Sequence, residues 1–586
     1  MENDGVVERL QRAIGSHTNV ASYASGIRSD STVSTQNANP EDPQMKLRTL
    51  YGCMLLCWFA LLPAGAQTNV ASSIPHLAKR GTATQLIVDG KPFLVLGGEL
   101  HNSSSSSIDY AEPILAKFSA GHLNTALAAV AWDLIEPEEG KFDFSLVDGL
   151  IQAARRHNLR LVLLWFGSWK NGVSTYAPVW VKTDLKRFPR AQDQEGKSLE
   201  ILSTLSDANR DADAHAFAAL MRHVRGADSD GQTVVMVQVE NEVGVLTDSR
   251  DRCAAANEAF RRPAPKELMD YLQKNKDTLI PEFRRIWEAA GAKTSGSWED
   301  IFGAGDATDE IFMAWNYARY VGRVAEAGKA EYPLPMFVNT WMAEWRETAP
   351  MKPGSYPSGG PMPHVQDIWR AGARRIDILS PDIYSYFEER CALYHRSGNP
   401  LFIPELVRET RTASAIFYGL GQHDAIGFSP FGMESVPAFA EELSKSYAIL
   451  AQIAPVVLEN QGKGATGGAL LDKEHPTQKL RVGDYTLNLG IARHYSFTTP
   501  EFPAGIFVQI GPDEYIVAGR GLTIGFTPNT PGDPIVGIVS AEDGVFVNGH
   551  WVAGRRLNGD EILSGKGLRL RGDYYMIQRV KLYRYR

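Results

Sequence analysis

The sequence has few cysteines, no surplus of basic residues and no apolar run long enough to span a bilayer. Four cysteines occur among 586 residues, and no Cys-x-x-Cys pair or His/Cys cluster predicts a structural metal site. Lys and Arg number 60 against 68 Asp and Glu, so the net charge is −8 and argues against a nucleic-acid-binding surface. We therefore expect neither a bound metal nor a nucleic-acid partner.

One apolar run near the N-terminus has the layout of a secretory signal peptide. Residues 51–62 carry no charge, follow a basic start at 45–48 and precede a small-residue stretch at 63–66. At about 12 residues, the run is shorter than the roughly 20 that a membrane span needs. We expect a signal peptide at 45–66, export to the periplasm or the medium, and no membrane span in the mature chain.

The segment before this signal is polar and rich in Ser, Asn and Asp. Residues 1–44 are either a disordered leader or the result of a start codon assigned too early, with translation beginning at Met45. Cys53 and Cys57 fall within the signal, which leaves Cys253 and Cys391 in the mature chain. The sequence leaves open whether these two pair.

The middle of the chain alternates short apolar runs with longer amphipathic segments. Continuous apolar runs are typical of parallel strands buried on both faces, and apolar spacing at i, i+3 and i+4 is typical of helices packed on one side. The eight runs are 93–100, 123–132, 159–166, 233–240, 336–341, 378–384, 401–406 and 425–431. This rhythm predicts an α/β fold, a (β/α)8 TIM barrel over residues 75–455.

The pattern of apolar and polar residues changes after about Pro455. Helical periodicity fades, and short strand-like runs are separated by Gly, Pro, Asn and Asp. This pattern predicts a smaller all-β, sandwich-like domain over residues 470–586. We expect it to be structural, because its one candidate sugar-binding aromatic, Trp551, is more readily explained by packing.

Two of the predicted barrel strands end in a carboxylate. The fourth run leads into Glu240-Asn241-Glu242, and the seventh leads through Ile403-Pro404 into Glu405. Reactive residues of a TIM barrel lie at the carboxyl ends of its strands, and a buried acid there needs a partner or a task. Two facing carboxylates are what glycosidic bond cleavage requires, one as proton donor and the other as nucleophile or base.

At this point the sequence resembles the glycoside hydrolase family 35 β-galactosidases, in particular a bacterial subgroup with a C-terminal β domain. Residues 238–244, QVENEVG, are similar to the family's QxENEYG, with Val243 where Tyr is common. The resemblance implies that Glu242 is the general acid/base, that Asn241 binds the sugar 2-hydroxyl, and that Glu405 is the nucleophile. It covers roughly residues 78–455.

Further segments of the predicted barrel carry the same resemblance. Residues 123–125 and 132–144 are similar to the family's LNT…W…EP..G.FDF stretch, which implies that Glu136 is a galactose-binding carboxylate. Residues 97–102, GGELHN, stand where better-known members carry GSIHY, so that Glu99, His101 and Asn102 are expected to face the sugar. Glu99 and Asn102 depart from the family pattern at those positions.

Three aromatic residues complete the set of substrate-binding candidates. Tyr384 ends the sixth run, where the family's clan places a tyrosine that hydrogen-bonds the nucleophile; the alternative is core packing. Trp165 and Trp341 end the third and fifth runs and serve either as stacking platforms for a sugar or as filler at the top of the barrel.

The resemblance implies an exo-acting enzyme that removes terminal β-D-galactose from oligosaccharides or plant polysaccharide side chains with retention, without any metal or organic cofactor. Two alternatives stay open. One is another retaining β-glycosidase of the same clan, which recognises a different sugar. The other is a carbohydrate-binding protein without catalysis. The sequence does not indicate the natural substrate or the oligomeric state.

Overall fold

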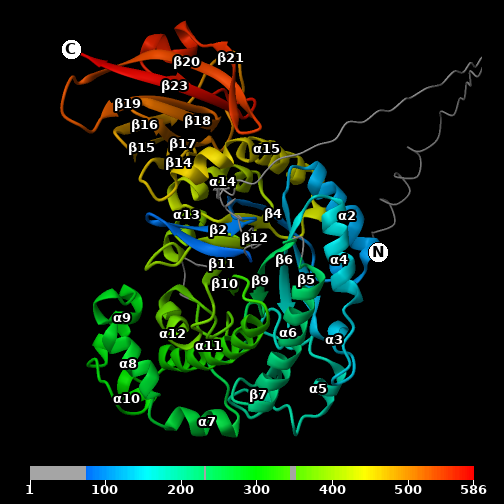
Figure 1. Ribbon diagram of the computed structural model, residues 1–586. Coiled ribbons are helices and arrows are strands. Elements are labelled where there is room, and N and C mark those ends of the chain that lie inside the picture. Colours follow the sequence, from blue (N-terminus) through cyan, green and yellow to red (C-terminus); the bar gives the residue numbers. More distant parts are fainter. Residues whose placement is uncertain (1–73, 230–231, 343–350) are drawn as a thin grey trace, which may run out of the picture. The chain divides into compact units, whose positions relative to one another are not determined.

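The computed structural model describes residues 74–229, 232–342 and 351–586. The predicted leader (1–44) and signal peptide (45–66) lie outside the described residues. Within the described ranges, no helix is both long and apolar enough to cross a membrane. Two compact features organise this part of the chain, a closed parallel barrel and a set of antiparallel sheets that follows it (Figure 1).

The eight predicted runs form the eight strands of one closed parallel barrel. Its strands follow the chain order, and the last pairs with the first through Gly427 and Val95. The strands are β4 (Val95–Glu99), β5 (Thr125–Ala131), β6 (Arg160–Phe166), β9 (Val234–Val239), β10 (Met336–Trp341), β11 (Ile378–Ile383), β12 (Phe402–Leu406) and β13 (Gly427–Pro430). The predicted TIM barrel is therefore confirmed.

Alternate residues of each strand point into the barrel and toward the helices. Along β6, Val162, Leu164 and Phe166 join one buried cluster in the barrel interior, whereas Leu163 and Trp165 join the larger cluster between the barrel and its helices. Both faces are apolar because both are covered, which is why these strands read as continuous runs.

Helices surround the barrel, and an insertion between β9 and β10 supplies several more. The helices that accompany the strands are α2 (Ile108–Ala120), α3 (Trp132–Ile135), α4 (Ser145–Arg156), α5 (Val179–Thr183), α6 (Asp207–Ala227), α11 (Asp306–Glu331), α12 (Gln366–Gly372), α13 (Phe387–Tyr394), α14 (Thr410–His423) and α15 (Pro437–Asn460). The insertion before α11 contains α7 (Ala254–Arg261), α8 (Lys266–Lys274), α9 (Pro281–Ala289) and α10 (Trp298–Phe302). A short ribbon, β7 (Arg190–Gln192) and β8 (Ser198–Leu202), follows α5.

A three-stranded sheet lies at the start of the described chain and contributes to the barrel core. It consists of β1 (His76–Arg80), β2 (Ala83–Val88) and β3 (Lys91–Phe93). Asp89 and Gly90, both with positive φ, form the tight turn that the Asp-Gly pair predicts. Leu86 and Val88 of β2 belong to the same buried cluster as the barrel interior, so this hairpin covers one end of the barrel core.

The C-terminal region forms two antiparallel sheets around a core of its own. The strand order is β14-β17-β18-β23-β20-β21 in one sheet and β15-β16-β19-β22 in the other. The strands are β14 (Thr466–Leu470), β15 (Thr477–Val482), β16 (Tyr485–Ile491), β17 (Ala504–Gly511), β18 (Glu514–Arg520), β19 (Leu522–Pro528), β20 (Ile535–Val547), β21 (His550–Arg556), β22 (Leu568–Arg569) and β23 (Met576–Tyr585). The predicted all-β region is thus present.

The β region is joined to the barrel through helices α14 and α15. Gly467 and Gly468 of β14 let the strand approach α14 closely, because a Cβ on Gly468 would lie 2.6 Å from the carbonyl oxygen of Phe417. The ring of Tyr575 stacks on Phe417 at 5.3 Å. The helix α15 continues to Asn460, through the proline at 455 where the change of sequence texture begins.

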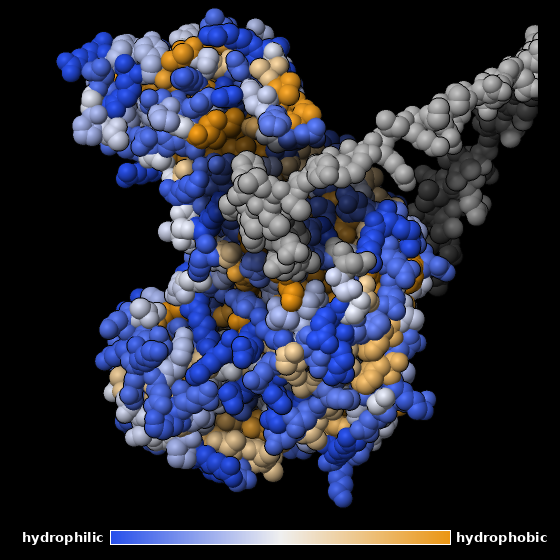
Figure 2. Space-filling view, viewed as in Figure 1, coloured by the Kyte–Doolittle hydropathy of each residue, from blue (hydrophilic) through white to orange (hydrophobic). Residues whose placement is uncertain are grey.

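The surface of the described chain is mostly hydrophilic, with small apolar patches. Figure 2 shows orange, hydrophobic atoms gathered among blue ones over the C-terminal sheets. The ribbon β20–β21 contributes to this pattern, since Val545, Val547 and Val552 are exposed.

Candidate active site

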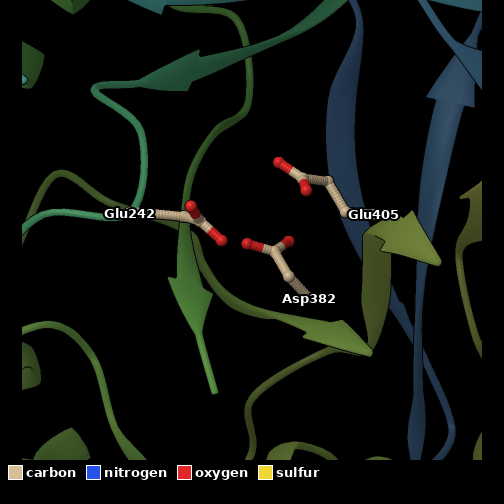
Figure 3. A group of neighbouring side chains, drawn as sticks. All are labelled: Glu242, Asp382 and Glu405. Atoms are coloured by element: carbon tan, nitrogen blue, oxygen red, sulfur yellow. The ribbon is translucent and has the colours of Figure 1, made fainter. Parts of the chain in front are cut away.

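Three carboxyl groups converge at the carboxyl-terminal end of the barrel. Glu242 follows β9, Asp382 ends β11 and Glu405 lies in β12, and their side chains point toward one another (Figure 3). One oxygen from each lies within 4.8 Å of the others, and all three residues are buried. Asp382 and Glu405 are register partners on adjacent strands, so the sheet itself holds them side by side. The structure therefore brings together the two glutamates predicted as catalytic.

The backbone after β9 adopts an unusual conformation that separates two neighbouring glutamates. Glu240 and Glu242 have φ values of 62° and 47°, in the left-handed region that few non-glycine residues occupy. Two hydrogen bonds hold this turn: Glu242 N–H donates to Asn339 Oδ1 at 3.0 Å, and Asn241 N–H donates to the carbonyl of Trp169 at 3.2 Å. As a result, Glu242 faces the barrel mouth and Glu240 does not.

Glu240 instead lies between the barrel wall and α6. Its Oε2 accepts a hydrogen bond of 2.8 Å from the backbone N–H of Trp169, and its carboxyl faces Asp213. Asp213 already accepts hydrogen bonds from Trp165 and from Ser168. Burial, and then the Asp213 carboxylate, raise the pKa of Glu240 well above its usual range, which favours a proton between the two acids.

Glu242 has the surroundings of a carboxylic acid that keeps its proton. Burial raises its pKa to about 8, and the nearby charge of Glu405 acts in the same direction, against smaller opposing effects of Lys170 and Asp382. The side-chain amide of Asn171 donates a hydrogen bond of 2.6 Å to Oε2. Glu242 can therefore donate a proton near neutral pH.

Glu405 is surrounded by hydrogen-bond donors instead. The hydroxyl of Tyr384 donates to its Oε2 at 2.8 Å, and the amides of Asn241 and Asn339 donate to its Oε1, each at 3.4 Å. Donors of this kind hold a carboxyl group in one orientation. The predicted tyrosine contact is present, and Asn241 lies between the two glutamates, where it can reach a sugar bound there.

Asp382 was not among the predicted site residues. Its Oδ2 accepts a hydrogen bond of 2.8 Å from Asn339, and burial followed by the charges of Glu405 and Glu242 raises its pKa well above the usual range. The spacing of the three carboxylates would suit a cation, but acids that keep their protons are poor ligands for one. The signal available in the sequence was an acidic residue at the end of an apolar run.

Lys170 is the second site residue that the sequence did not reveal. It lies in the loop after β6, is 4% exposed, and its ammonium stands 5.1 Å from the centre of the Phe166 ring. Burial lowers its pKa, but the charges of Glu405, Glu242, Glu99 and Asp382 outweigh this and raise it. Because a loop and not a strand end carries Lys170, the strand pattern gave no reason to select it.

The three residues predicted after the first barrel strand lie in different surroundings. Burial, and then Glu405, raise the pKa of Glu99 well above its usual range, which places it beside the catalytic pair. His101 contacts the loop after β13: its Nε2 and Ser435 Oγ are 2.5 Å apart, and its ring meets Phe431 edge-on at 5.2 Å. Asn102 lines a separate hollow of about 120 Å³ between β5 and α4.

Two of the predicted substrate-binding residues are placed where a sugar cannot reach them. Trp165 is fully buried on the helix-facing side of β6, donates to Asp213 at 2.9 Å and packs against Phe217 of α6. Glu136 is buried in the loop after α3, where its two oxygens accept from the Trp132 indole at 2.9 Å and from the Gly140 amide at 2.7 Å. Both predictions are corrected: these side chains hold the scaffold together.

Trp341 and Tyr384, in contrast, are open at the barrel mouth. Trp341 is 40% exposed and is the register partner of Asp382 on the neighbouring strand. Tyr384 also borders a larger cavity of about 710 Å³, bounded by the loops after β11 and β12 and by Asp472 and His475 after β14. The mouth therefore combines an aromatic face with polar groups, as carbohydrate sites do.

The two cysteines among the described residues do not pair. Cys253 and Cys391 are both free, and Cys391 is buried in α13. The sequence left their pairing open, and the structure shows that they form no disulfide with each other.

Comparison with known proteins agrees with this geometry. Residues 109–316 match the family-42 glycoside hydrolase model described as beta-galactosidase, and residues 443–569 match a domain of unknown function (DUF5597). The first match includes Glu242 and ends before Glu405. The matching model is that of family 42 and not of family 35, which the motifs resemble.

Curated relatives with detectable similarity are β-galactosidases. The chain is 31% identical to the beta-galactosidase of Xanthomonas manihotis over 209 residues, which is 34% of this chain and 32% of the relative. It is 26% identical to beta-galactosidase 11 of Arabidopsis thaliana over 167 residues, 28% of this chain and 18% of the relative. The chain thus spans about a third or less of the length of these relatives.

Solved β-galactosidase structures resemble the chain more loosely. The enzyme from Halorubrum lacusprofundi has a TM-score of 0.41 at 16% identity, with 61% of this chain and 58% of that chain covered. The enzyme from Bacillus circulans sp. alkalophilus has a TM-score of 0.42 at 16% identity, with 63% and 57% covered.

The closed barrel, the two facing glutamates and the partial family match point to the same class of protein, the glycoside hydrolases. Residues 109–316 are similar to the glycoside hydrolases described as beta-galactosidase, and about a third of the chain resembles a curated β-galactosidase.

Proposed function

We propose that the protein is an exported, retaining, exo-acting β-galactosidase of the family-35 type, which removes terminal β-D-galactose from oligosaccharides or plant polysaccharide side chains. The single observation that carries the proposal is the arrangement of Glu242 and Glu405. Their oxygens lie within 4.8 Å of one another, burial raises the pKa of Glu242, and the hydroxyl of Tyr384 orients the carboxyl group of Glu405. Retaining glycosidases have carboxyl groups about 5–5.5 Å apart, and inverting ones about 6.5–9.5 Å.

The first chemical step uses both glutamates. An oxygen of Glu405 attacks the anomeric carbon and forms an ester bond, while the bond from that carbon to the leaving oxygen breaks. Glu242 gives its proton to the leaving oxygen, so that the aglycone departs as a neutral alcohol. Tyr384 and the two asparagines hold the attacking carboxylate in place during this step.

The second step reverses the roles. Glu242, now charged, takes a proton from a water molecule that attacks the same carbon, and the ester bond to Glu405 breaks. Both glutamates return to their starting forms, and the released sugar has the configuration of the substrate. Asn241, beside Glu405, is positioned to bind the 2-hydroxyl more strongly in the transition state than in the ground state.

Hydrolysis of an aryl β-galactoside tests the activity. We expect the wild type to release the phenol, and Glu405→Gln and Glu242→Gln each to lose at least about a thousandfold in kcat. Glu441→Gln, an exposed carboxylate on α15, is the matched control and should retain full activity. Full activity in both Glu242→Gln and Glu405→Gln would contradict the assignment and favour a different reaction centre.

Retention and the identity of the nucleophile need a separate measurement. With a 2-deoxy-2-fluoro galactoside that carries a good leaving group, we expect a stable covalent adduct on the peptide that contains Glu405. Proton NMR of the first product should show the β-anomer. An α-anomer as first product, with no adduct, would indicate inversion and overturn the double-displacement mechanism.

The two alternatives are separated by the same assay. Aryl glycosides that differ only at O4 distinguish a β-galactosidase from another retaining β-glycosidase of the clan, because the catalytic pair is indifferent to that position. A protein that binds sugar and hydrolyses none of these substrates would be the silent carbohydrate-binding protein. Export is tested by detecting the protein in cell fractions with an antibody to its C-terminus. Removal of residues 45–66 would show as a shorter band in the exported fraction.

A further inference from the structure

Lys170 is buried, precedes Asn171, which donates to Glu242, and has no hydrogen-bond or ion-pair partner for its ammonium among the described residues. Its backbone is fixed by reciprocal hydrogen bonds with Val173, at 2.8 and 3.1 Å, so the side chain starts from a defined point. Within the described part of the chain, the ammonium makes no hydrogen bond and no ion pair shorter than 4.0 Å. Only the face of the Phe166 ring lies close to it, at 5.1 Å.

Glu99 is in a corresponding position with the opposite chemistry. It ends β4, is 1% exposed, and its Oε2 has no hydrogen-bond partner among the described residues. It lies at the carboxyl end of its barrel strand, as Glu405 does, and Glu405, Lys170, Glu242 and Glu434 all act on it electrostatically. Among the described residues, Oε2 of Glu99 is therefore left as an acceptor that a bound ligand can use.

These two groups are close enough to influence one another but do not pair. A buried donor or acceptor without a partner is unfavourable, and Lys170 alone offers three donors. A separation beyond 4.0 Å leaves room for other polar atoms between them. A sugar hydroxyl both accepts and donates, so two neighbouring hydroxyls could satisfy the ammonium and the carboxyl at once.

We propose that Lys170 and Glu99 bind the vicinal 3- and 4-hydroxyls of the sugar whose anomeric carbon lies between Glu242 and Glu405. The inference rests on the proposed function, in which Asn241 takes the 2-hydroxyl. The adjacent hydroxyls that remain on a hexopyranose ring are then those at C3 and C4. Lys170 donates to one oxygen and Glu99 pairs with the next, and this clamp reads the orientation at C4 that distinguishes galactose from glucose.

Deoxy substrates test the clamp directly. The substrates are aryl β-galactosides, intact or lacking the 3-, 4- or 6-hydroxyl, and the enzymes are wild type, Lys170→Met and the exposed control Lys186→Met. For wild type, we expect removal of the 3- or 4-hydroxyl to lower kcat/KM about 100-fold or more, and removal of the 6-hydroxyl to matter less. Lys186→Met should behave as wild type.

The decisive result is non-additivity. Lys170→Met should be about 100-fold slower on the intact substrate, yet lose less than about threefold more on either the 3-deoxy or the 4-deoxy substrate, because the contact is already gone. A lysine that only supports the fold would impose the same penalty on all four substrates, and this outcome would overturn the proposal. Glu99→Gln keeps the shape of the side chain and should weaken the contact with the other of the two hydroxyls. This variant replaces Lys170→Met in the test if the latter does not fold.

Failure of this inference can be told apart from failure of the proposed function. If wild type hydrolyses a different aryl β-glycoside, the galactose assignment fails, and the deoxy series on that sugar still tests the clamp. If no glycoside is hydrolysed, binding of D-galactose and its 3- and 4-deoxy derivatives is compared in wild type and Lys170→Met by saturation-transfer NMR. Binding that depends on these hydroxyls in wild type alone supports the clamp; an identical pattern in both proteins refutes it.

Discussion

The hydroxyl of Tyr384 donates a hydrogen bond of 2.8 Å to Oε2 of Glu405. The two residues come from neighbouring barrel strands, β11 and β12, and Tyr384 approaches from the open side of the mouth. This contact orients the carboxyl group that we propose as the nucleophile, and it is made by a side chain that is partly exposed.

Replacement of Tyr384 should therefore slow the chemistry more than the binding. For Tyr384→Phe, we expect kcat on an aryl β-galactoside to fall about 10- to 100-fold with little change in KM, since a hydrogen bond to a charged group contributes about 1.5–3 kcal/mol. Tyr386→Phe is the matched control, because Tyr386 is equally exposed on the same loop. Equal effects of the two substitutions would show that the contact with Glu405 is unimportant.

The pH profile of the enzyme should report the proton on Glu242. Burial, reinforced by Glu405, raises the pKa of Glu242 to about 8. Because the acid must be protonated to assist departure of the leaving group, kcat/KM should fall as pH rises through about 8. A dinitrophenyl galactoside, whose leaving group needs no proton, should lose most of this alkaline limb. An identical limb for both substrates would assign it to another group.

Two tryptophans near the ends of barrel strands β6 and β10 should behave in opposite ways. Trp341→Ala removes a 40% exposed ring from the mouth, so we expect kcat/KM to fall about tenfold while the free energy of unfolding changes by no more than about 0.5 kcal/mol. Trp165→Ala empties a buried site behind the barrel wall, so we expect a loss of about 3–5 kcal/mol in stability. Denaturant unfolding and initial rates measure both. A stable Trp165→Ala enzyme with weakened substrate binding would contradict this division of roles.

The stability of the protein should depend on the proton shared by Glu240 and Asp213. The pKa of Glu240 is raised in the folded state, so above the ordinary value of 4.5 the folded protein binds more protons than the unfolded chain, and stability falls as pH rises. Glu240→Gln supplies a permanent donor to Asp213. We expect its melting temperature to equal that of wild type near pH 5 and to exceed it increasingly up to pH 9. The exposed Glu195→Gln should show no such trend, and a pH-independent difference for Glu240→Gln would contradict the shared proton.

The sequence by itself determined the barrel architecture and singled out Glu242 and Glu405 as the candidate catalytic pair. Strands covered on both faces have to be apolar along their whole length, and the carboxylates of Glu242 and Glu405 break that pattern at strand ends, where a barrel gathers its mouth. Both signals are local along the chain, so they can be read without knowing which strands are neighbours.

Only the tertiary structure decided which other side chains reach the mouth. Alternation along β6 turns Trp165 toward α6, although it stands at a strand end. A local hydrogen-bond network holds Glu136, although its segment resembles the family motif. Lys170 and Asp382 enter the site from a loop and from the strand next to Glu405. Their roles depend on the electrostatic field of residues distant in sequence, and such a field exists only once the chain has folded.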